Sequence, residues 1–333
     1  MKNKKNILLG IIGFILIIII ILFLIIMFDR DKKINNLNNI IIDLTNLYTK
    51  DKSIILNKDE LIINKGGNYI LQGKYNGRIL IDAKSKTNIT LNSVNIDTKY
   101  NPCISILKGS PVDFIIPAYS RNYLKDMYSS STIYSEEDIS IDGIGSLTIM
   151  SGGEYGINIL NNSFTIKGSI LEINGNSSIK AKDIKVLGGE IYFNSKKDSI
   201  ISDNLIINDG NIYISSLING LNIKNPYIIN GGRSVILSQI NNSVLDDNSK
   251  EDVFVFKTED KILKDTTSFL TDSDDKLIIS FSNNNDYNLC IISVPGVNKK
   301  SYNLYINGYN EGKKVRGVYG KGKYILGSKK NIY

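Results

Sequence analysis

The sequence predicts an all-β protein. Its main part is expected to be a parallel β-helix, a solenoid of short strands, with a small C-terminal β module after it and one N-terminal transmembrane helix before it. Between residues 135 and 239 one segment recurs as 164–173, 184–193, 205–214 and 227–236, with a longer copy at 139–149. Aligned on Ile141, Ile166, Val186, Ile207 and Ile229, the copies follow one another after 25, 20, 21 and 22 residues. A period near 20 residues is typical of solenoids.

The pattern inside each copy shows what kind of solenoid this is. Apolar residues alternate with other residues on both sides of a Gly or small-residue break, as in 184–193. An alternation of period 2 indicates short strands with one buried face, and no copy holds an apolar-periodic run long enough for a helix of about 10 residues. Stacked about 4.8 Å apart, such coils would fill their interior with Ile, Val and Leu. Of the 333 residues 42% are hydrophobic, and Trp is absent, which suits aliphatic ladders.

The N-terminal segment, residues 1–33, is predicted to form a cytoplasmic tip and a transmembrane signal anchor. Ile7 to Phe28 are 22 residues without a charge. As a helix they would span roughly 33 Å, about the thickness of the hydrocarbon core of a bilayer. The run is longer than the apolar region of a cleaved signal peptide, and no small-residue cleavage site follows it, although cleavage stays an alternative. We therefore expect a single-pass protein of the cell membrane with its β domain outside the cell.

Three further segments follow. Residues 34–59 are expected to form a stem or a capping segment, because apolar residues at heptad spacing suggest a short coiled coil or a helix that covers the open end of the β-helix. Residues 60–240 are expected to hold the parallel β-helix. Within them, residues 117–137 are Ser- and Tyr-rich and are expected to bulge out as an irregular loop. Residues 241–333 are expected to form the C-terminal β module with a basic, Tyr- and Gly-rich tail.

Several blocks of the chain resemble a known family. They are GGNYILQGKYNGRILIDAKSKTNITLNSVNI (66–96), VDFIIPAYSRNYLKD (112–126), IYSEEDISIDGIGSLTI (133–149), the repeats, and the closing segments 280–282 and 302–308. Together they resemble the bacterial carbohydrate-binding domain-containing proteins of the calcium-dependent, pectin-binding type, over about residues 60–327. The resemblance implies a right-handed parallel β-helix of pectate-lyase type, surface display, bound calcium and binding of acidic polysaccharide such as polygalacturonate.

The resemblance also implies calcium sites at the corners of the coils, and here the sequence departs from it. In the family each corner reads Asp-Gly-Ile. In this sequence the corresponding corners are 155–157, 177–179, 198–200 and 219–221, and only the corner at 198–200 keeps the Asp. Calcium prefers 6–8 oxygen ligands with several carboxylates. The candidate metal ligands are therefore Asp183, Asp198 and Asp203 on neighbouring coils. The alternative is that these carboxylates accept hydrogen bonds from backbone N–H groups in the turns.

The charge distribution gives a second candidate site. The chain has 40 Lys and Arg against 33 Asp and Glu, and residues 299–330 hold nine of the basic residues against Glu311 alone. Tyr rings can stack on sugars, and Lys or Arg can pair with the carboxylates of an anionic polymer. The candidate carbohydrate-binding residues are Lys313, Lys314, Arg316, Tyr305, Tyr309 and Tyr319. A basic surface without specificity is the alternative, and nucleic acid is not expected as a partner outside the cell.

Catalysis has little support in the sequence. The chain has no His, which excludes Ser-His-Asp and Cys-His arrangements, and Cys103 and Cys290 lack CxxC spacing. A calcium-dependent polysaccharide lyase stays an alternative, with Lys196, Lys197 or Arg233 as the base if they share a face with Asp198 and Asp203. The sequence thus predicts a non-catalytic surface protein that binds acidic polysaccharide, with calcium as the expected cofactor. A structural or adhesive stalk without a soluble-sugar ligand is the other alternative.

Overall fold

The computed structural model describes residues 39–109, 111–272, 274, 276–295, 302–306, 313–316 and 318–320. The chain divides into two units, Met1–Ile40 and Ile41–Tyr333, and only Asn39 and Ile40 of the first are described. The described residues form strands and no helix, which confirms the all-β prediction. No helix in them is long and apolar enough to cross a membrane. The predicted anchor lies outside the described residues.

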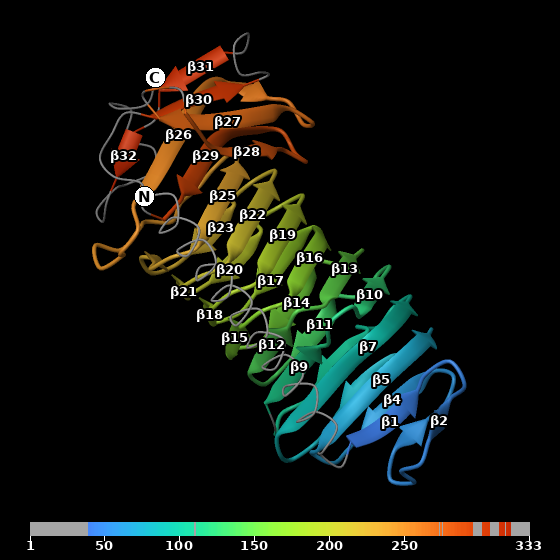
Figure 1. The fold of residues 1–333 in the computed structure, drawn as a ribbon. Helices are drawn as coiled ribbons and strands as arrows, with labels where there is room; N and C mark the ends of the chain where they lie inside the picture. The colour runs from blue at the N-terminus through green and yellow to red at the C-terminus, as the bar shows by residue number, and fades with distance from the viewer. Residues whose placement is uncertain are drawn as a thin grey trace, which may run out of the picture. The chain divides into compact units, whose positions relative to one another are not determined.

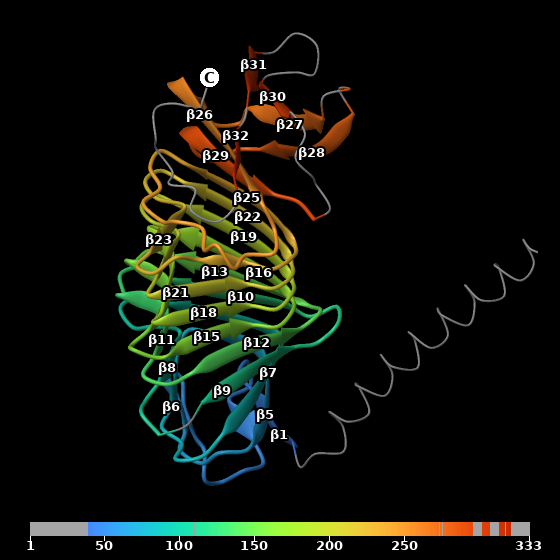
Figure 2. The same cartoon turned by 90° about the vertical axis from the view of Figure 1, so that its left-hand side faces the viewer.

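The main body is a parallel β-solenoid of about 8 turns, as the repeats predict. From residue 112 onward each full turn places one strand on each of three faces, and strands of the same face lie side by side (Figures 1 and 2). The first face holds β9 (Val112–Ile116), β12 (Ile139–Gly143), β15 (Ser163–Ile166), β18 (Asp183–Val186), β21 (Asn204–Ile207) and β24 (Ile228–Ile229). The second face holds β10 (Arg121–Asp126), β13 (Ser146–Ser151), β16 (Ile170–Gly175), β19 (Glu190–Ser195), β22 (Asn211–Ser216) and β25 (Arg233–Ser238).

The third face is a separate sheet, which is parallel except for a short antiparallel strand that pairs with β4 at its N-terminal edge. It holds β4 (Glu60–Ile63), β6 (Arg78–Ile81), β8 (Ile104–Ile106), β11 (Ser131–Ser135), β14 (Tyr155–Ile159), β17 (Ser177–Lys180), β20 (Ile200–Ser202) and β23 (Leu221–Ile223). In the early turns, β5 (Asn68–Tyr75) and β7 (Thr87–Thr98) are long enough to serve both other faces. The start of β7 pairs with β9 and its end pairs with β10.

The core consists of inward rows in which equivalent residues of successive turns pack on one another. On the second face one such row contains Leu124, Ile149, Ile173, Phe193, Ile214 and Ile236, which face each other in register and are almost fully buried. Their neighbours along each strand point outward because side chains alternate across a strand. The register of the core therefore also sets the register of the outer surface.

The prediction of an irregular loop at 117–137 is wrong, because this segment forms β10 and β11. Its apolar pattern is interrupted where polar side chains turn inward. Asn122 is buried, accepts a hydrogen bond from the Val94 N–H at 2.9 Å and donates to the Ser146 carbonyl oxygen at 3.1 Å. The buried Asp126 accepts from the Thr132 hydroxyl at 2.5 Å. Hydrogen bonds thus satisfy a polar stretch of the interior that hydrophobic alternation cannot reveal.

The prediction of a helix or coiled coil is wrong for the described part of 34–59. Residues 39–56 form β1 (Asn39–Asp43), β2 (Tyr48–Thr49) and β3 (Ile55–Leu56), and β1 and β2 pair antiparallel. The Asp43 carboxylate accepts hydrogen bonds from the N–H groups of Thr45 and Asn46, both at 3.0 Å, which favours a turn over a helix. Backbone N–H of Leu44 donates to the Gln72 carbonyl oxygen. The segment therefore covers strand edges at the start of the solenoid, with β1 against β5 and β3 against β4.

The C-terminal module begins where the last coil meets an antiparallel strand. It comprises β26 (Val253–Ile262), β27 (Thr267–Asp272), β28 (Leu277–Ser282), β29 (Tyr287–Ser293), β30 (Tyr302–Ile306), β31 (Lys313–Arg316) and β32 (Val318–Gly320). Strand β29 pairs antiparallel with both β25 and β26, so it ends the parallel stacking of the second face. Phe254, Phe256, Leu270, Ile292 and Leu304 lie in one buried cluster of this module.

We expect Ile173→Ala to lower the free energy of unfolding by about 2–5 kcal/mol, because it opens a cavity in a packed inward row. Ile170 lies three residues earlier on the same strand, but its side chain points outward and is 39% exposed. Ile170→Ala is the matched control and should cost about 0.5 kcal/mol or less. Urea denaturation of both variants measures the difference, and equal losses would contradict the assignment of inner and outer rows.

Candidate functional site

A groove of about 690 Å³ lies where strands of the third face end, and we call it the lysine groove. It is lined by Asn158, Ile159, Leu160, Asn161, Lys180, Ala181, Lys182, Ile201, Ser202, Asp203, Asn222 and Lys224. Its floor includes one outward row in register, formed by Asn158 of β14, Lys180 of β17, Ile201 of β20 and Asn222 of β23. The groove therefore crosses several turns and is open to an extended ligand.

Local sequence explains why the lysines face the solvent. Ile179 points into the core and is fully buried, so its neighbour Lys180 must point outward. Ala181 is again buried, and Lys182 is exposed at the corner before β18. Lys224 occupies the equivalent corner after β23, two turns further on. The alternation that builds the core thus also places the ammonium groups on the surface.

The groove carries an excess of positive charge. Lys180 Nζ lies 5.2 Å from the centre of the Tyr155 ring, so its ammonium group contacts an aromatic face and makes no ion pair with a described carboxylate. Lys224 Nζ is 4.0 Å from Asp203 Oδ1, an exposed ion pair that contributes little. Lys182 makes no ion pair with any residue that the structure describes. Three lysines and one carboxylate therefore line the groove, and the groove can accept anionic groups of a ligand.

Amide side chains add hydrogen-bonding capacity to the groove. Asn222 Nδ2 donates to Asp198 Oδ2 at 2.7 Å, which fixes the orientation of the amide. Asn158 and Asn161 lie along the same groove, and Asn161 has a positive φ of 56° in the turn after β14. Amides can donate to and accept from sugar hydroxyls, whereas ammonium groups only donate.

The three candidate metal ligands do not come together. Asp203 lines the lysine groove, Asp183 accepts a hydrogen bond from Asn204 Nδ2 at 2.5 Å, and Asp198 accepts from the Asn219 backbone and side chain at 3.1 and 2.8 Å. Asn225 Nδ2 donates to Asn204 Oδ1 at 2.9 Å, extending the row of Asp183 by another turn. In the described ranges no group of three or more His, Cys, Asp or Glu residues could hold a metal ion. These side chains therefore do not form a calcium site by themselves.

The residues proposed as a lyase base do not face Asp203. Lys196 and Lys197 lie at the corner between the second and third faces, and Arg233 begins β25 on the second face. Asp203 lies after β20, at the opposite corner of the third face. Of the two aspartates, only Asp198 shares a corner with Lys196 and Lys197.

The structure places only some of the candidate residues of the C-terminal tail. Strand β31 pairs with β30 and sets Lys314 opposite Tyr305, Lys313 opposite Ile306 and Arg316 opposite Asn303. Tyr319 lies in β32, where it pairs with Phe254 of β26. The backbone thus brings Tyr305 into one sheet with the three basic residues and places Tyr319 in another. Tyr309 lies outside the described residues.

The lysine groove is not apparent from the sequence, because its charged residues lie far apart in the chain. A basic run such as 313–316 is visible directly, but Lys182 and Lys224 line one groove only once the coils are stacked. A usable signal was present. When the repeats are aligned, Lys182, Asp203 and Lys224 fall at corresponding positions after successive third-face strands.

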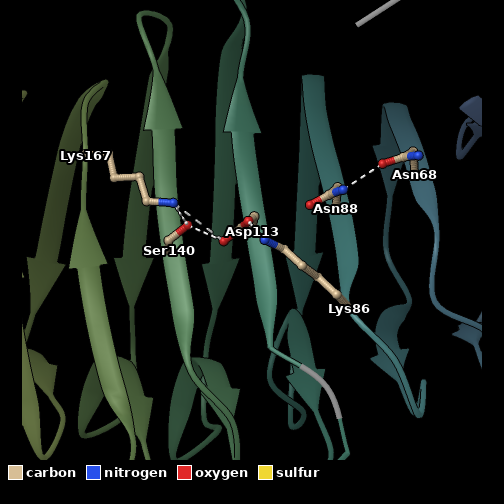
Figure 3. A network of polar contacts seen from close by, with 6 residues as sticks. All are labelled: Asn68, Lys86, Asn88, Asp113, Ser140 and Lys167. Carbon is tan, nitrogen blue, oxygen red and sulfur yellow. Dashed lines mark hydrogen bonds and ion pairs between the residues drawn. The ribbon is translucent and has the colours of Figure 1, made fainter. Parts of the chain in front are cut away.

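A second polar cluster lies on the first face and is occupied by its own contacts (Figure 3). Asp113 Oδ2 is 2.6 Å from Lys86 Nζ, and Asp113 Oδ1 is 3.8 Å from Lys167 Nζ and accepts a hydrogen bond from the Ser140 hydroxyl. Burial raises the pKa of Asp113, but Lys86, Ser140 and Lys167 outweigh it and hold this pKa below the ordinary 3.8. The lysines here neutralise a protein carboxylate, so this cluster stabilises the coils and offers less free charge than the lysine groove.

The stacked coils and the open groove define a solenoid protein with a surface site suited to an extended polymer. The family model described as "Carbohydrate-binding domain-containing protein" matches residues 57–284, and the chain belongs to this family. This confirms the resemblance found in the sequence. Among solved structures, the chain is similar to a polysaccharide lyase-like protein from C. thermocellum, solved as a gadolinium derivative. The two share 22% identity over 62% of this chain and 95% of the other, with a TM-score of 0.52, which supports the fold. No curated protein matches the chain.

We expect Asp113→Asn to destabilise the protein at neutral pH and to lose this effect in acid. A carboxyl whose folded-state pKa lies below the unfolded value of about 3.9 adds stability that is fully present above that value. The stability is lost as the pH falls through the lower folded-state pKa. The difference in free energy of unfolding between wild type and variant should therefore be full at pH 6 and should shrink progressively as the pH is lowered below about 4.

Asp97→Asn serves as the control for this experiment. The Asp97 carboxylate lies 3.6 Å from Lys125 Nζ in a more exposed ion pair. Exposed pairs contribute little, so the loss at pH 6 should be smaller than for Asp113→Asn. A loss at Asp113 that is independent of pH would show that shape, and not charge, makes this cluster stabilising.

Proposed function

We propose that this protein binds an acidic polysaccharide of the polygalacturonate kind in the lysine groove and does not cleave it. The observation that carries the proposal is the charge of the groove, which is lined by Lys180, Lys182 and Lys224 and, among the described residues, by a single carboxylate, Asp203. Membership of a carbohydrate-binding family supports a sugar polymer as the ligand. Uronate carboxylates are the anionic groups that such a polymer presents.

The spacing of the turns supports an extended ligand. Successive turns of a parallel solenoid lie about 4.8 Å apart, so the row from Asn158 to Asn222 offers contacts at regular intervals. A polymer lying along this row would meet Lys180 and Lys182 in one turn and Lys224 two turns later. Asn158 and Asn222 would bind hydroxyl groups between the carboxylates.

Display at the cell surface and the use of calcium belong to the same proposal. The uncharged run Ile7–Phe28 would anchor the protein as a single-pass membrane protein, with the solenoid outside the cell. Calcium would act between Asp203 and the ligand, since the described carboxylates do not form a site of their own. An adhesive stalk that binds no soluble sugar is the competing function, because a solenoid also serves as a spacer.

We expect the double variant Lys180→Gln/Lys182→Gln to bind polygalacturonate about tenfold more weakly than the wild type at low salt. Each lysine–carboxylate contact at a partly exposed site contributes up to about 1 kcal/mol, and about 1.4 kcal/mol is tenfold in affinity. Titration calorimetry with the full-length chain measures the change. Wild-type affinity should also fall as NaCl is raised in steps.

The control is Lys185→Gln/Lys196→Gln, which removes the same charge from exposed lysines outside the groove. Equal losses in both double variants would mean that net charge and not the groove binds the polymer. Intact binding in both, combined with a loss on changing Lys313, Lys314 and Arg316 to Glu, would move the site to the C-terminal tail. No formation of an absorbing unsaturated product is expected, and its appearance would establish a lyase.

Calcium is tested in the same assay. We expect Ca²⁺ to strengthen binding relative to EDTA, and Asp203→Asn to remove that gain, because a hard cation needs carboxylate oxygens on both partners. Equal affinity with Ca²⁺ and with EDTA would show that the lysines bind the polymer without a metal.

A further inference from the structure

A second cleft, of about 470 Å³, lies on the second face against the C-terminal module, and we call it the tyrosine cleft. It is lined by Glu172, Asn174, Tyr192, Phe193, Asn194, Tyr213, Ser280, Phe281, Ser282 and Asn284. The solenoid supplies its floor from β16, β19 and β22, and strand β28 with the turn after it supplies a wall. Nothing in the lysine groove is shared with it, so the two sites are independent.

The floor of the tyrosine cleft is one outward row in register. Glu172, Tyr192 and Tyr213 are equivalent residues of three successive turns. Tyr192 is 42% exposed although it is a large aromatic side chain. Tyr213 is held differently, because its hydroxyl donates to the Ser282 carbonyl oxygen and so ties the floor to the wall. The row therefore presents one accessible ring, Tyr192, between the Glu172 carboxylate and the fixed ring of Tyr213.

Polar atoms of the cleft remain available to a ligand. Asn174 Nδ2 donates to Glu172 Oε1 at 2.8 Å, and Asn194 Oδ1 accepts from Asn285 Nδ2 at 2.7 Å. These contacts fix both amides in orientation. Glu172 Oε2, Asn174 Oδ1 and Asn194 Nδ2 have no hydrogen-bond partner among the residues that the structure describes. Two acceptors and one donor are thus positioned on the floor.

The charge of the tyrosine cleft is opposite to that of the lysine groove. Among the residues that the structure describes, Glu172 is the only charged one that lines the cleft, and no Lys or Arg does. A carboxylate without a neighbouring cation repels an anionic polymer, whereas it accepts hydrogen bonds from neutral hydroxyl groups. An exposed tyrosine ring offers an apolar surface to the C–H face of a pyranose.

We propose that the tyrosine cleft is a second carbohydrate site, which binds an uncharged pyranose chain. Tyr192 is the stacking platform, and Glu172, Asn174 and Asn194 bind hydroxyl groups. The solenoid then carries a site for a neutral polysaccharide on its second face and a site for an acidic one on its third. The proposal stands on the cleft alone and does not depend on the ligand of the lysine groove.

The test uses the full-length chain and three neutral probes, the β-1,4-linked hexasaccharides of glucose, xylose and mannose, in titration calorimetry. We expect the wild type to bind at least one of them with an affinity that does not change with NaCl. Tyr192→Ala should lower this affinity by about tenfold, a loss typical of an aromatic contact. Tyr192→Phe keeps the ring and should retain most of it, and Glu172→Gln should weaken binding without changing the fold.

Tyr123→Ala is the matched control, because Tyr123 occupies the same outward row two turns before Glu172 and lies outside the cleft. It should bind the probe like the wild type, as should Lys180→Gln/Lys182→Gln. The proposal is overturned if the wild type binds none of the three probes, or if Tyr192→Ala and Glu172→Gln both bind like the wild type. It is also overturned if Tyr192→Ala weakens polygalacturonate binding instead.

Discussion

The stacking of equivalent inward side chains on successive turns is the interaction on which the rest of this structure depends. A single turn of about 20 residues cannot bury its own apolar face, so each turn is stable only against its neighbours. The row from Leu124 to Ile236 shows how strictly the register is kept, since every member faces its equivalent in the next turn. A slip by one residue would turn the whole row outward.

This constraint also organises the surface. Because inner and outer positions alternate along every strand, a core in register forces outer residues into rows that run across the turns. The lysine groove and the tyrosine cleft are two such rows on different faces, one cationic and one with a single carboxylate. The two rows share no lining residue, so one scaffold presents two separate surfaces of different charge.

The fold could be predicted from the sequence wherever the core is aliphatic. The copies from residue 164 onward show both the period and the alternation, and they correspond to strands of the first and second faces. The prediction failed at 117–137 because Asn122 and Asp126 occupy inward positions, where hydrogen bonds replace apolar packing. It failed at 39–56 because the heptad spacing of a few apolar residues cannot be distinguished from short strands over so brief a stretch.

The sites were harder to predict, and the tyrosine cleft shows why. Its floor repeats with the turns and could be found by aligning the copies, since Glu172, Tyr192 and Tyr213 share one position of the repeat. Its wall follows no repeat, because Ser280 to Asn284 belong to the module that ends the solenoid.

An open parallel stack exposes unpaired strand edges and must be closed, and antiparallel β29 closes it on β25. Asn285 then anchors the module by donating to Asn194 and to the Ser195 and Ser215 carbonyl oxygens. The same closure that protects the last turn thus sets β28 beside the outward row, and a flat face becomes a cleft.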